Sequence, residues 1–240
     1  MTSEVDAWGA IFRDQWAGVA AGHQIERDDG RVDKFESAAS YFTTPRFDVE
    51  RELLARLEGP VLDLGCGPGS YALYLQNLGL QVTASDYSPG ALDVCRARGC
   101  KDVLRNDLRK FRAAPGAFRS VIVMGNTLGA HQTPATFPAF LSELRSTVGA
   151  GGHLLFSMID PLDTTDERHL AYRRRNLDQG LPPGLIRIRV RYGDLVEDWF
   201  SLWMLTADEL ESQTHATGWR IIEERRDGFW RLRLLEALKK

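Results

Sequence analysis

The sequence has few cysteines, no long apolar run and no excess of basic residues. Its three cysteines, Cys66, Cys95 and Cys100, are an odd number without paired C-x-x-C spacing, so we expect neither disulfides nor a metal site. No apolar run approaches the ~20 residues that span a membrane. Residues 1–10 are acidic and lack the apolar core of a signal peptide. We therefore expect a cytoplasmic protein without membrane contact.

The charge balance argues against a nucleic acid partner. Thirty Lys and Arg residues against 33 Asp and Glu give a formal net charge of −3 at pH 7, whereas nucleic-acid-binding domains usually carry a positive excess. Internal repeats and low-complexity tracts are also missing. A length of 240 residues with 43% hydrophobic content fits one α/β domain with additions.

One stretch, residues 61–71 (VLDLGCGPGSY), combines a short apolar run with closely spaced glycines. The apolar run is followed by Gly65, Gly67 and Gly69 and then by leucines at helical spacing. This order predicts a buried strand, a glycine-rich turn and a helix. Glycine allows a ligand to approach the backbone closely, and many Rossmann-like proteins bind a nucleotide at this first crossing.

The glycine spacing and one acidic residue indicate which nucleotide would bind. A dinucleotide fingerprint requires G-x-G-x-x-G, but Ser70 stands where its third glycine should be. Asp63 would repel a pyrophosphate and attract an amino-acid ammonium group. The stretch closely resembles motif I of the class I S-adenosylmethionine-dependent methyltransferases, in which this loop receives the methionine part of the cofactor.

Acidic residues near the ends of the next two predicted strands fit the same cofactor. Asp86 ends strand 80–87 and can accept hydrogen bonds from both ribose hydroxyls. Asp107 lies in strand 101–108, where the resemblance implies a contact to the adenine amine; its alternative role is a helix N-cap. In all, the resemblance implies cofactor contacts from Tyr41, Arg46, Asp63, Gly65, Cys66, Gly67, Gly69, Asp86, Tyr87, Asn106, Asp107, Leu108, Met124, Gly125 and Asn126.

Two of these residues precede the glycine-rich stretch, and their roles are open. In similar methyltransferases a residue just before the helix predicted at 47–57 often meets the cofactor. Arg46 could hold the methionine carboxylate through a bidentate contact, or it could be a solvated arginine at a helix start. Tyr41 is equally open.

The loop after the fourth predicted strand (residues 125–131, GNTLGAH) corresponds to motif IV of the family, which lies near the transferred methyl. His131 is the side chain of this loop that titrates near physiological pH, so it is the candidate general base. A structural hydrogen bond is its alternative role. A base is needed only if the acceptor is protonated, so the reaction can also proceed without a catalytic residue.

The alternation of strands and helices up to residue 159 predicts parallel strands joined by right-handed crossovers. The resemblance implies a Rossmann-like three-layer α/β sandwich with a seven-stranded, mostly parallel sheet whose last strand is antiparallel. We expect an N-terminal helical cap (residues 1–44), with a polar break at 22–30, and a methyltransferase domain (residues 45–240). Residues 160–205 are expected to be a substrate-side insertion with an antiparallel hairpin.

The predicted function is in-line methyl transfer from S-adenosylmethionine to an oxygen, nitrogen or carbon nucleophile of a small-molecule substrate. One alternative is a non-methylating use of the same cofactor, such as intramolecular cyclisation; another is a non-catalytic nucleotide-binding module. The aromatic residues of the cap either pack on the main domain or form a lid. Arginines of the insertion either hold an acidic substrate or form a solvated face. A homodimer is one possibility for the oligomeric state.

Overall fold

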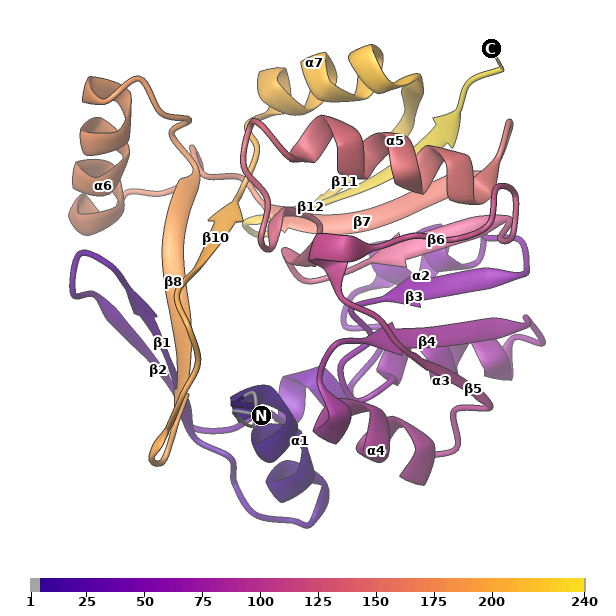
Figure 1. Ribbon diagram of the computed structural model, residues 1–240, viewed down its shortest axis with the longest axis horizontal. Helices are drawn as coiled ribbons and strands as arrows, with labels where there is room; N and C mark the ends of the chain where they lie inside the picture. Colours follow the sequence, from indigo (N-terminus) through magenta and orange to yellow (C-terminus); the bar gives the residue numbers. More distant parts are fainter. Residues whose placement is uncertain (1–4, 240) are drawn as a thin grey trace.

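A seven-stranded sheet forms the centre of the computed structural model, which describes residues 5–239 (Figure 1). Its strand order is β11-β12-β7-β6-β3-β4-β5. The strands are β3 (Val61–Leu64), β4 (Val82–Asp86), β5 (Asp102–Arg105), β6 (Ser120–Val123), β7 (His153–Ile159), β11 (Trp219–Asp227) and β12 (Trp230–Ala237). Strands β3 to β7 pair in parallel, and β12 is antiparallel to both its neighbours. The predicted sheet with an antiparallel last strand is therefore confirmed.

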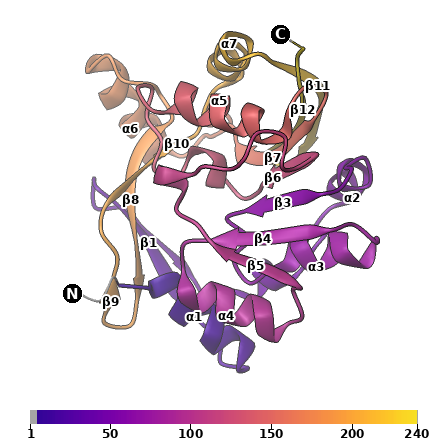
Figure 2. The ribbon, with the colours of Figure 1, turned by 45° about the vertical axis from the view of Figure 1, so that its right-hand side comes forward.

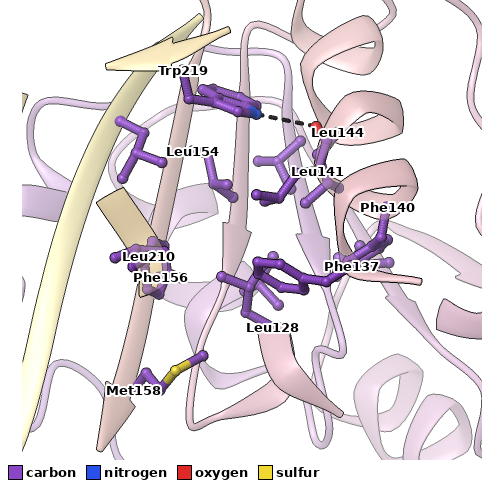
Figure 3. Packing of buried hydrophobic residues seen from close by; sticks show 14 of the residues in the cluster. Leu128, Phe137, Phe140, Leu141, Leu144, Leu154, Phe156, Met158, Leu210 and Trp219 are labelled. Carbon is purple, nitrogen blue, oxygen red and sulfur yellow. Dashed lines mark hydrogen bonds between the residues drawn. The ribbon is translucent and has the colours of Figure 1, made fainter. Parts of the chain in front are cut away.

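Helices cover both faces of this sheet. One face is covered by α5 (Phe137–Val148) and α7 (Ala207–Thr217), the other by α2 (Asp48–Leu54), α3 (Ser70–Asn77) and α4 (Pro89–Ala97). Alternate strand residues supply the two cores: Leu62 and Leu64 pack toward α5, and Val61 packs toward α2 and α3. On the α5 side (Figure 3), the indole of Trp219 donates a 3.1 Å hydrogen bond to the carbonyl of Leu141.

A second sheet joins the two segments that differ from the central fold. It has the order β10-β8-β1-β2, and β9 pairs with β8. Its strands are β1 (His23–Arg27), β2 (Val32–Phe35), β8 (Leu185–Tyr192), β9 (Leu195–Val196) and β10 (Phe200–Trp203). The predicted hairpin of the insertion is present. The expected polar break at residues 22–30 is wrong, because β1 lies there and pairs with the distant β8.

Two further helices flank the second sheet. Helix α1 (Ala7–Trp16) packs between this sheet and α4, with Ile11 and Phe12 against Ala91 and Val190. Helix α6 (Glu167–Asp178) lies at the outer end of β8 (Figure 1). Figure 2 shows the second sheet and α1 beside the carboxyl ends of the parallel strands. The predicted cap helix is therefore present, although residues 1–4 of the predicted cap lie outside the described residues.

Three short 3-10 helices complete the elements near these strand ends: η1 (Ala39–Phe42), η2 (Leu108–Lys110) and η3 (Thr127–Gly129). Among residues 5–239, no helix is both long and apolar enough to span a bilayer. The same part of the chain contains no group of three or more His, Cys, Asp or Glu side chains that could hold a metal ion.

Candidate active site

The glycine-rich turn between β3 and α3 needs glycine for two separate reasons. Gly65 and Gly69 have φ angles of 81° and 80°, in the left-handed region. A Cβ on Gly65 would lie 2.5 Å from Cγ2 of Thr127, and one on Gly69 would lie 2.5 Å from the Sγ atoms of Cys95 and Cys100. Side chains at these positions would therefore clash as well as strain the backbone.

The carboxylate of Asp63 is buried at the start of this turn. Its Oδ2 atom has no hydrogen-bond partner among the described residues. Burial, and secondarily the nearby carboxylate of Asp86, raise the pKa of Asp63 to about 8. A cationic ligand group beside Oδ2 would satisfy this atom and favour its ionised form, which is what an amino-acid ammonium group provides.

Asp86 connects the glycine-rich turn to the turn after β4. Its carboxylate accepts hydrogen bonds from the backbone amides of Gly67 (2.9 Å) and Ser88 (3.0 Å). A carboxylate offers about four acceptor positions, so ribose hydroxyls can still be accommodated. Burial raises the pKa of Asp86 above its ordinary value.

Two acidic residues that the sequence analysis did not identify fix α1 onto the turn after β4. Glu197 is buried and accepts hydrogen bonds from the Tyr87 hydroxyl (3.1 Å) and from the amides of Ala7 (3.1 Å) and Trp8 (3.3 Å). Asp6 caps α1 and accepts hydrogen bonds from the Ser88 hydroxyl (2.6 Å) and the Gly90 amide (2.9 Å). Neither residue belongs to a motif, so no local pattern could have identified them.

A shallow cleft of about 280 Å³ lies at the expected adenine end of the site. It is lined by Tyr87, Arg105, Asn106, Asp107, Arg109 and Lys110. Arg109 donates hydrogen bonds to both carboxylate oxygens of Asp107 and holds the pKa of that group below its ordinary value. Asp107 also caps η2, so its N-cap role is observed, and its adenine contact stays a prediction, as do those of Asn106 and Leu108. A hollow of about 390 Å³ beside Lys101 and Asp102 lies at the opposite ends of β4 and β5.

The loop after β6 is held by β7. The amide of Gly125 donates to the Ser157 hydroxyl (2.8 Å), and Oδ1 of Asn126 accepts from the amide of Ile159 (2.7 Å). Asn126 therefore stabilises the loop, and Met124 is buried beneath it. That these residues line the methionine end of the cofactor remains a prediction.

His131 lies where this loop meets the second sheet. Its amide donates to the carbonyl of Ser201 on β10 (2.7 Å), and its ring stacks on Phe200 with centroids 4.6 Å apart. Burial and the neighbouring Arg109 lower the pKa of His131, so the ring is neutral near pH 7. Neutral imidazole is the form that a general base requires.

Arg46 is engaged within the protein. Its Nη2 atom donates to the Tyr71 hydroxyl (3.2 Å) and lies 3.7 Å from the buried carboxylate of Glu50. The guanidinium also lies over the ring of Trp230, 5.3 Å from its centroid. A contact from Arg46 to a methionine carboxylate would compete with these interactions, and it stays a prediction.

Aromatic side chains of α1 and η1 cover the glycine-rich turn. Phe12 lies 3.5 Å from the position a Cβ of Gly67 would take. Tyr41 packs edge-on against both Trp8 and Phe12 at 5.4 Å, and its carbonyl accepts a hydrogen bond from Ser70 (2.6 Å). The predicted cap aromatics thus pack on the main domain directly above the expected cofactor site.

The arginines of β8 lie on its outer face. Arg187 and Arg189 alternate along the strand with the buried Ile188 and Val190. Arg189 and Arg191 both pair with Glu26, at 2.9 and 3.0 Å. This arrangement favours a solvated charged face over an acidic-substrate site.

The fold and the strand-end carboxylates define the class of protein. Residues 61–152 match the family model described as "Methyltransferase domain". The whole chain superimposes on an S-adenosylmethionine-dependent methyltransferase from Bacteroides fragilis in complex with S-adenosylhomocysteine, with a TM-score of 0.82, 25% identity, and coverage of 100% of this chain and 98% of that one. The chain therefore has the fold of the class I S-adenosylmethionine-dependent methyltransferases along its whole length and carries a methyltransferase domain over residues 61–152, and the superimposed enzyme binds the product of that cofactor.

Two further similarities cover the fold or part of the chain. A methyltransferase from Methanosarcina mazei shares the fold, with a TM-score of 0.65, 14% identity, and coverage of 81% of this chain and 99% of that one. Malonyl-[acyl-carrier protein] O-methyltransferase from Serratia marcescens is 34% identical over 104 residues, which are 41% of this chain and 38% of that enzyme. The chain therefore matches well under half of the length of this curated relative.

Proposed function

We propose that the protein transfers the methyl group of S-adenosylmethionine to an oxygen, nitrogen or carbon atom of a small-molecule acceptor. The observation that carries this proposal is the buried Asp63 carboxylate. Its unsatisfied Oδ2 lies beside a glycine-rich turn that Asp86 ties to the next parallel strand. A buried acidic group without a partner is costly unless a ligand cation supplies the missing interaction.

Each residue at the strand ends would bind a different part of the cofactor. Asp63 would accept the ammonium group, and the turn from Gly65 to Gly69 would receive the methionine chain. Asp86 would accept the ribose hydroxyls, and Tyr87 would pack on the adenine above the cleft. Bound in this way, S-adenosylmethionine supplies a methyl carbon that its positive sulfur has already activated.

The protein then contributes orientation, exclusion of water and, for a protonated acceptor, a base. The second sheet and α1 lie beside the carboxyl ends of the parallel strands (Figure 2), so an acceptor held between them and the strand ends would face the methionine end of the site. Correct orientation alone can lower a barrier by roughly 7–11 kcal/mol. His131 would take the proton of a protonated acceptor, because its neutral ring lies where the loop after β6 meets β10 of the second sheet.

Incubation with S-adenosylmethionine and a panel of small metabolites, followed by mass spectrometry, tests this function. We expect one metabolite to gain a single methyl group while S-adenosylhomocysteine accumulates. Release of methylthioadenosine would instead indicate cyclisation of the cofactor side chain. Tight cofactor binding without turnover of any metabolite would indicate a binding module and would contradict the proposal.

A further inference from the structure

An aromatic box surrounds His23 on the inner face of the second sheet. We define the box as Trp8, Phe35 and Tyr41, with His23 at its centre. The imidazole stacks on Phe35 with centroids 4.9 Å apart, and it lies 5.5 Å from Trp8 and 6.3 Å from Tyr41. His23 is only 2% exposed, so its ring is almost completely enclosed by these neighbours.

The hydrogen bonds of His23 leave one ring nitrogen unsatisfied. Nδ1 lies 3.1 Å from the carbonyl oxygen of Ala21, and because a carbonyl can only accept, Nδ1 carries the hydrogen. Burial lowers the pKa of His23, so the ring is neutral and Nε2 presents a lone pair. Nε2 is buried and has no hydrogen-bond partner among the described residues.

An unsatisfied buried nitrogen is unfavourable for folding alone. Leaving such a group without a partner costs about 1–3 kcal/mol, and a phenylalanine of similar shape would avoid this cost. An incoming O–H or N–H group would satisfy Nε2, and His23 differs from His153, which has a similar unpartnered nitrogen, in being surrounded by aromatic rings.

The box lies one aromatic layer from the cofactor site. Trp8 stacks on Phe12 at 5.5 Å, and Phe12 covers Gly67 of the glycine-rich turn. The outer walls of the box reach solvent, since Phe35 is 45% and Tyr41 43% exposed. Because Nε2 is buried, a small molecule would reach it only after one of these two exposed side chains moves aside.

We propose that this box binds an aromatic part of the methyl acceptor, and that His23 Nε2 accepts a hydrogen bond from its hydroxyl or ring N–H group. The four side chains supply aromatic faces, the Nε2 lone pair, the hydroxyl of Tyr41 and the indole N–H of Trp8, but no ionic partner for an ammonium or carboxylate group. A neutral, planar aromatic compound with a hydrogen-bond donor therefore fits best. His23 is then a residue that determines specificity, and the inference rests on the proposed methyltransferase function.

Binding of matched probes to the S-adenosylhomocysteine complex tests this inference without turnover. The probes are phenol, 2-naphthol and benzimidazole, each paired with a methyl-capped partner that lacks the donor: anisole, 2-methoxynaphthalene and 1-methylbenzimidazole. We expect at least one donor probe to bind the wild-type protein about tenfold more tightly than its capped partner, which is the effect of about one hydrogen bond. The His23→Phe variant should bind the two members of that pair equally.

Three results would overturn the inference. They are the absence of binding by all three donor probes, equal binding of donor and capped probes to the wild type, and a donor preference that persists in His23→Phe. Failure of S-adenosylhomocysteine itself to bind the wild-type protein would instead refute the proposed function, so the two failures are distinguishable.

Two further variants separate recognition from structure. His23→Gln keeps an acceptor atom and should retain part of the donor preference, which also provides a test if His23→Phe fails to fold. His153, at the amino end of β7, likewise has a buried ring nitrogen (Nδ1) without a partner among residues 5–239, so His153→Phe is a matched control that should keep the full preference. Loss of the preference in His153→Phe would contradict a specific role for His23.

Discussion

At the residue scale, burial of Asp63 lowers the free energy of unfolding of the ligand-free protein at neutral pH. Its pKa lies at about 8 in the folded protein against an ordinary value of 3.8. The folded state therefore retains a proton that the unfolded chain releases, and the cost of Asp63 grows as the pH rises from about 4 to about 8. Cofactor binding would recover this cost by placing a cation beside the carboxylate.

Replacement of Asp63 by asparagine should separate stability from binding. Asp63→Asn removes the buried charge, so we expect the ligand-free variant to unfold at a higher temperature than the wild type at about pH 8, by roughly 2–4 °C for each kcal/mol gained. The gain should be much smaller near pH 4, where the unfolded wild-type chain begins to hold the proton that the folded state holds. Thermal unfolding by circular dichroism at the two pH values measures this difference.

The same variant should lose affinity for S-adenosylhomocysteine by at least about tenfold. Binding near pH 7 should release protons from the wild type but not from Asp63→Asn, which calorimetry in buffers of different ionisation enthalpy detects. Equal affinity and equal proton release in the two proteins would contradict the assigned role of Asp63.

His131 makes a separate prediction for acceptors that carry a proton. His131→Gln should lower kcat by about 10²–10⁴-fold if the ring acts as the base. Because the pKa of His131 lies below 6.5, wild-type activity should fall only at more acidic pH, and this acidic decline should disappear in the variant. A variant with full activity and an unchanged pH profile would show that the acceptor needs no base from this loop.

At the scale of elements, the start of α1 depends on a side chain of the insertion. Glu197→Ala removes the acceptor of the Ala7, Trp8 and Tyr87 hydrogen bonds, so we expect a loss of about 1–3 kcal/mol in the free energy of unfolding. Glu197→Gln keeps an acceptor oxygen and should lose less. Urea denaturation measures both, and equal stability of the wild type and Glu197→Ala would mean that these bonds do not hold the helix.

Elements with local signals could be predicted from the sequence. Strand β3 follows from its apolar run, and α7 from the capping box of Thr206 and Glu209, whose reciprocal hydrogen bonds are present. Strand β1 could not be predicted, because its stability depends on pairing with β8 across most of the chain.

The candidate site likewise contains residues with a local sequence signal and residues that depend on distant contacts. Asp63 and Asp86 are predicted as cofactor-binding residues from their positions at or near strand ends. His23 and Glu197 are functional candidates only because of the distant residues that they contact, and no spacing along the chain reveals those contacts.

At the scale of the whole molecule, the cofactor site and the substrate side share one hydrogen-bond network. Asp86 joins the glycine-rich turn to Ser88, Asp6 joins Ser88 to α1, and Glu197 joins α1 and Tyr87 to the second sheet. Ordering of the strand ends by a ligand should therefore reach α1 and the second sheet, the elements proposed to contact the acceptor.

Hydrogen exchange tests this coupling. We expect S-adenosylhomocysteine to slow amide exchange in the glycine-rich turn and also in α1 and β8 of the wild-type protein. In Glu197→Ala the protection should persist in the turn and weaken in β8. Protection confined to the turn in the wild type would show that the two sheets respond independently.

The central claim is that strand-end carboxylates hold S-adenosylmethionine, and titration calorimetry with S-adenosylhomocysteine tests it most directly. We predict single-site binding to the wild type, a loss of at least about tenfold in affinity for Asp86→Ala, and no change for Asp102→Ala, an exposed aspartate at the amino end of β5. A flat titration of the wild type, or equal affinity of the wild type and Asp86→Ala, would contradict the claim.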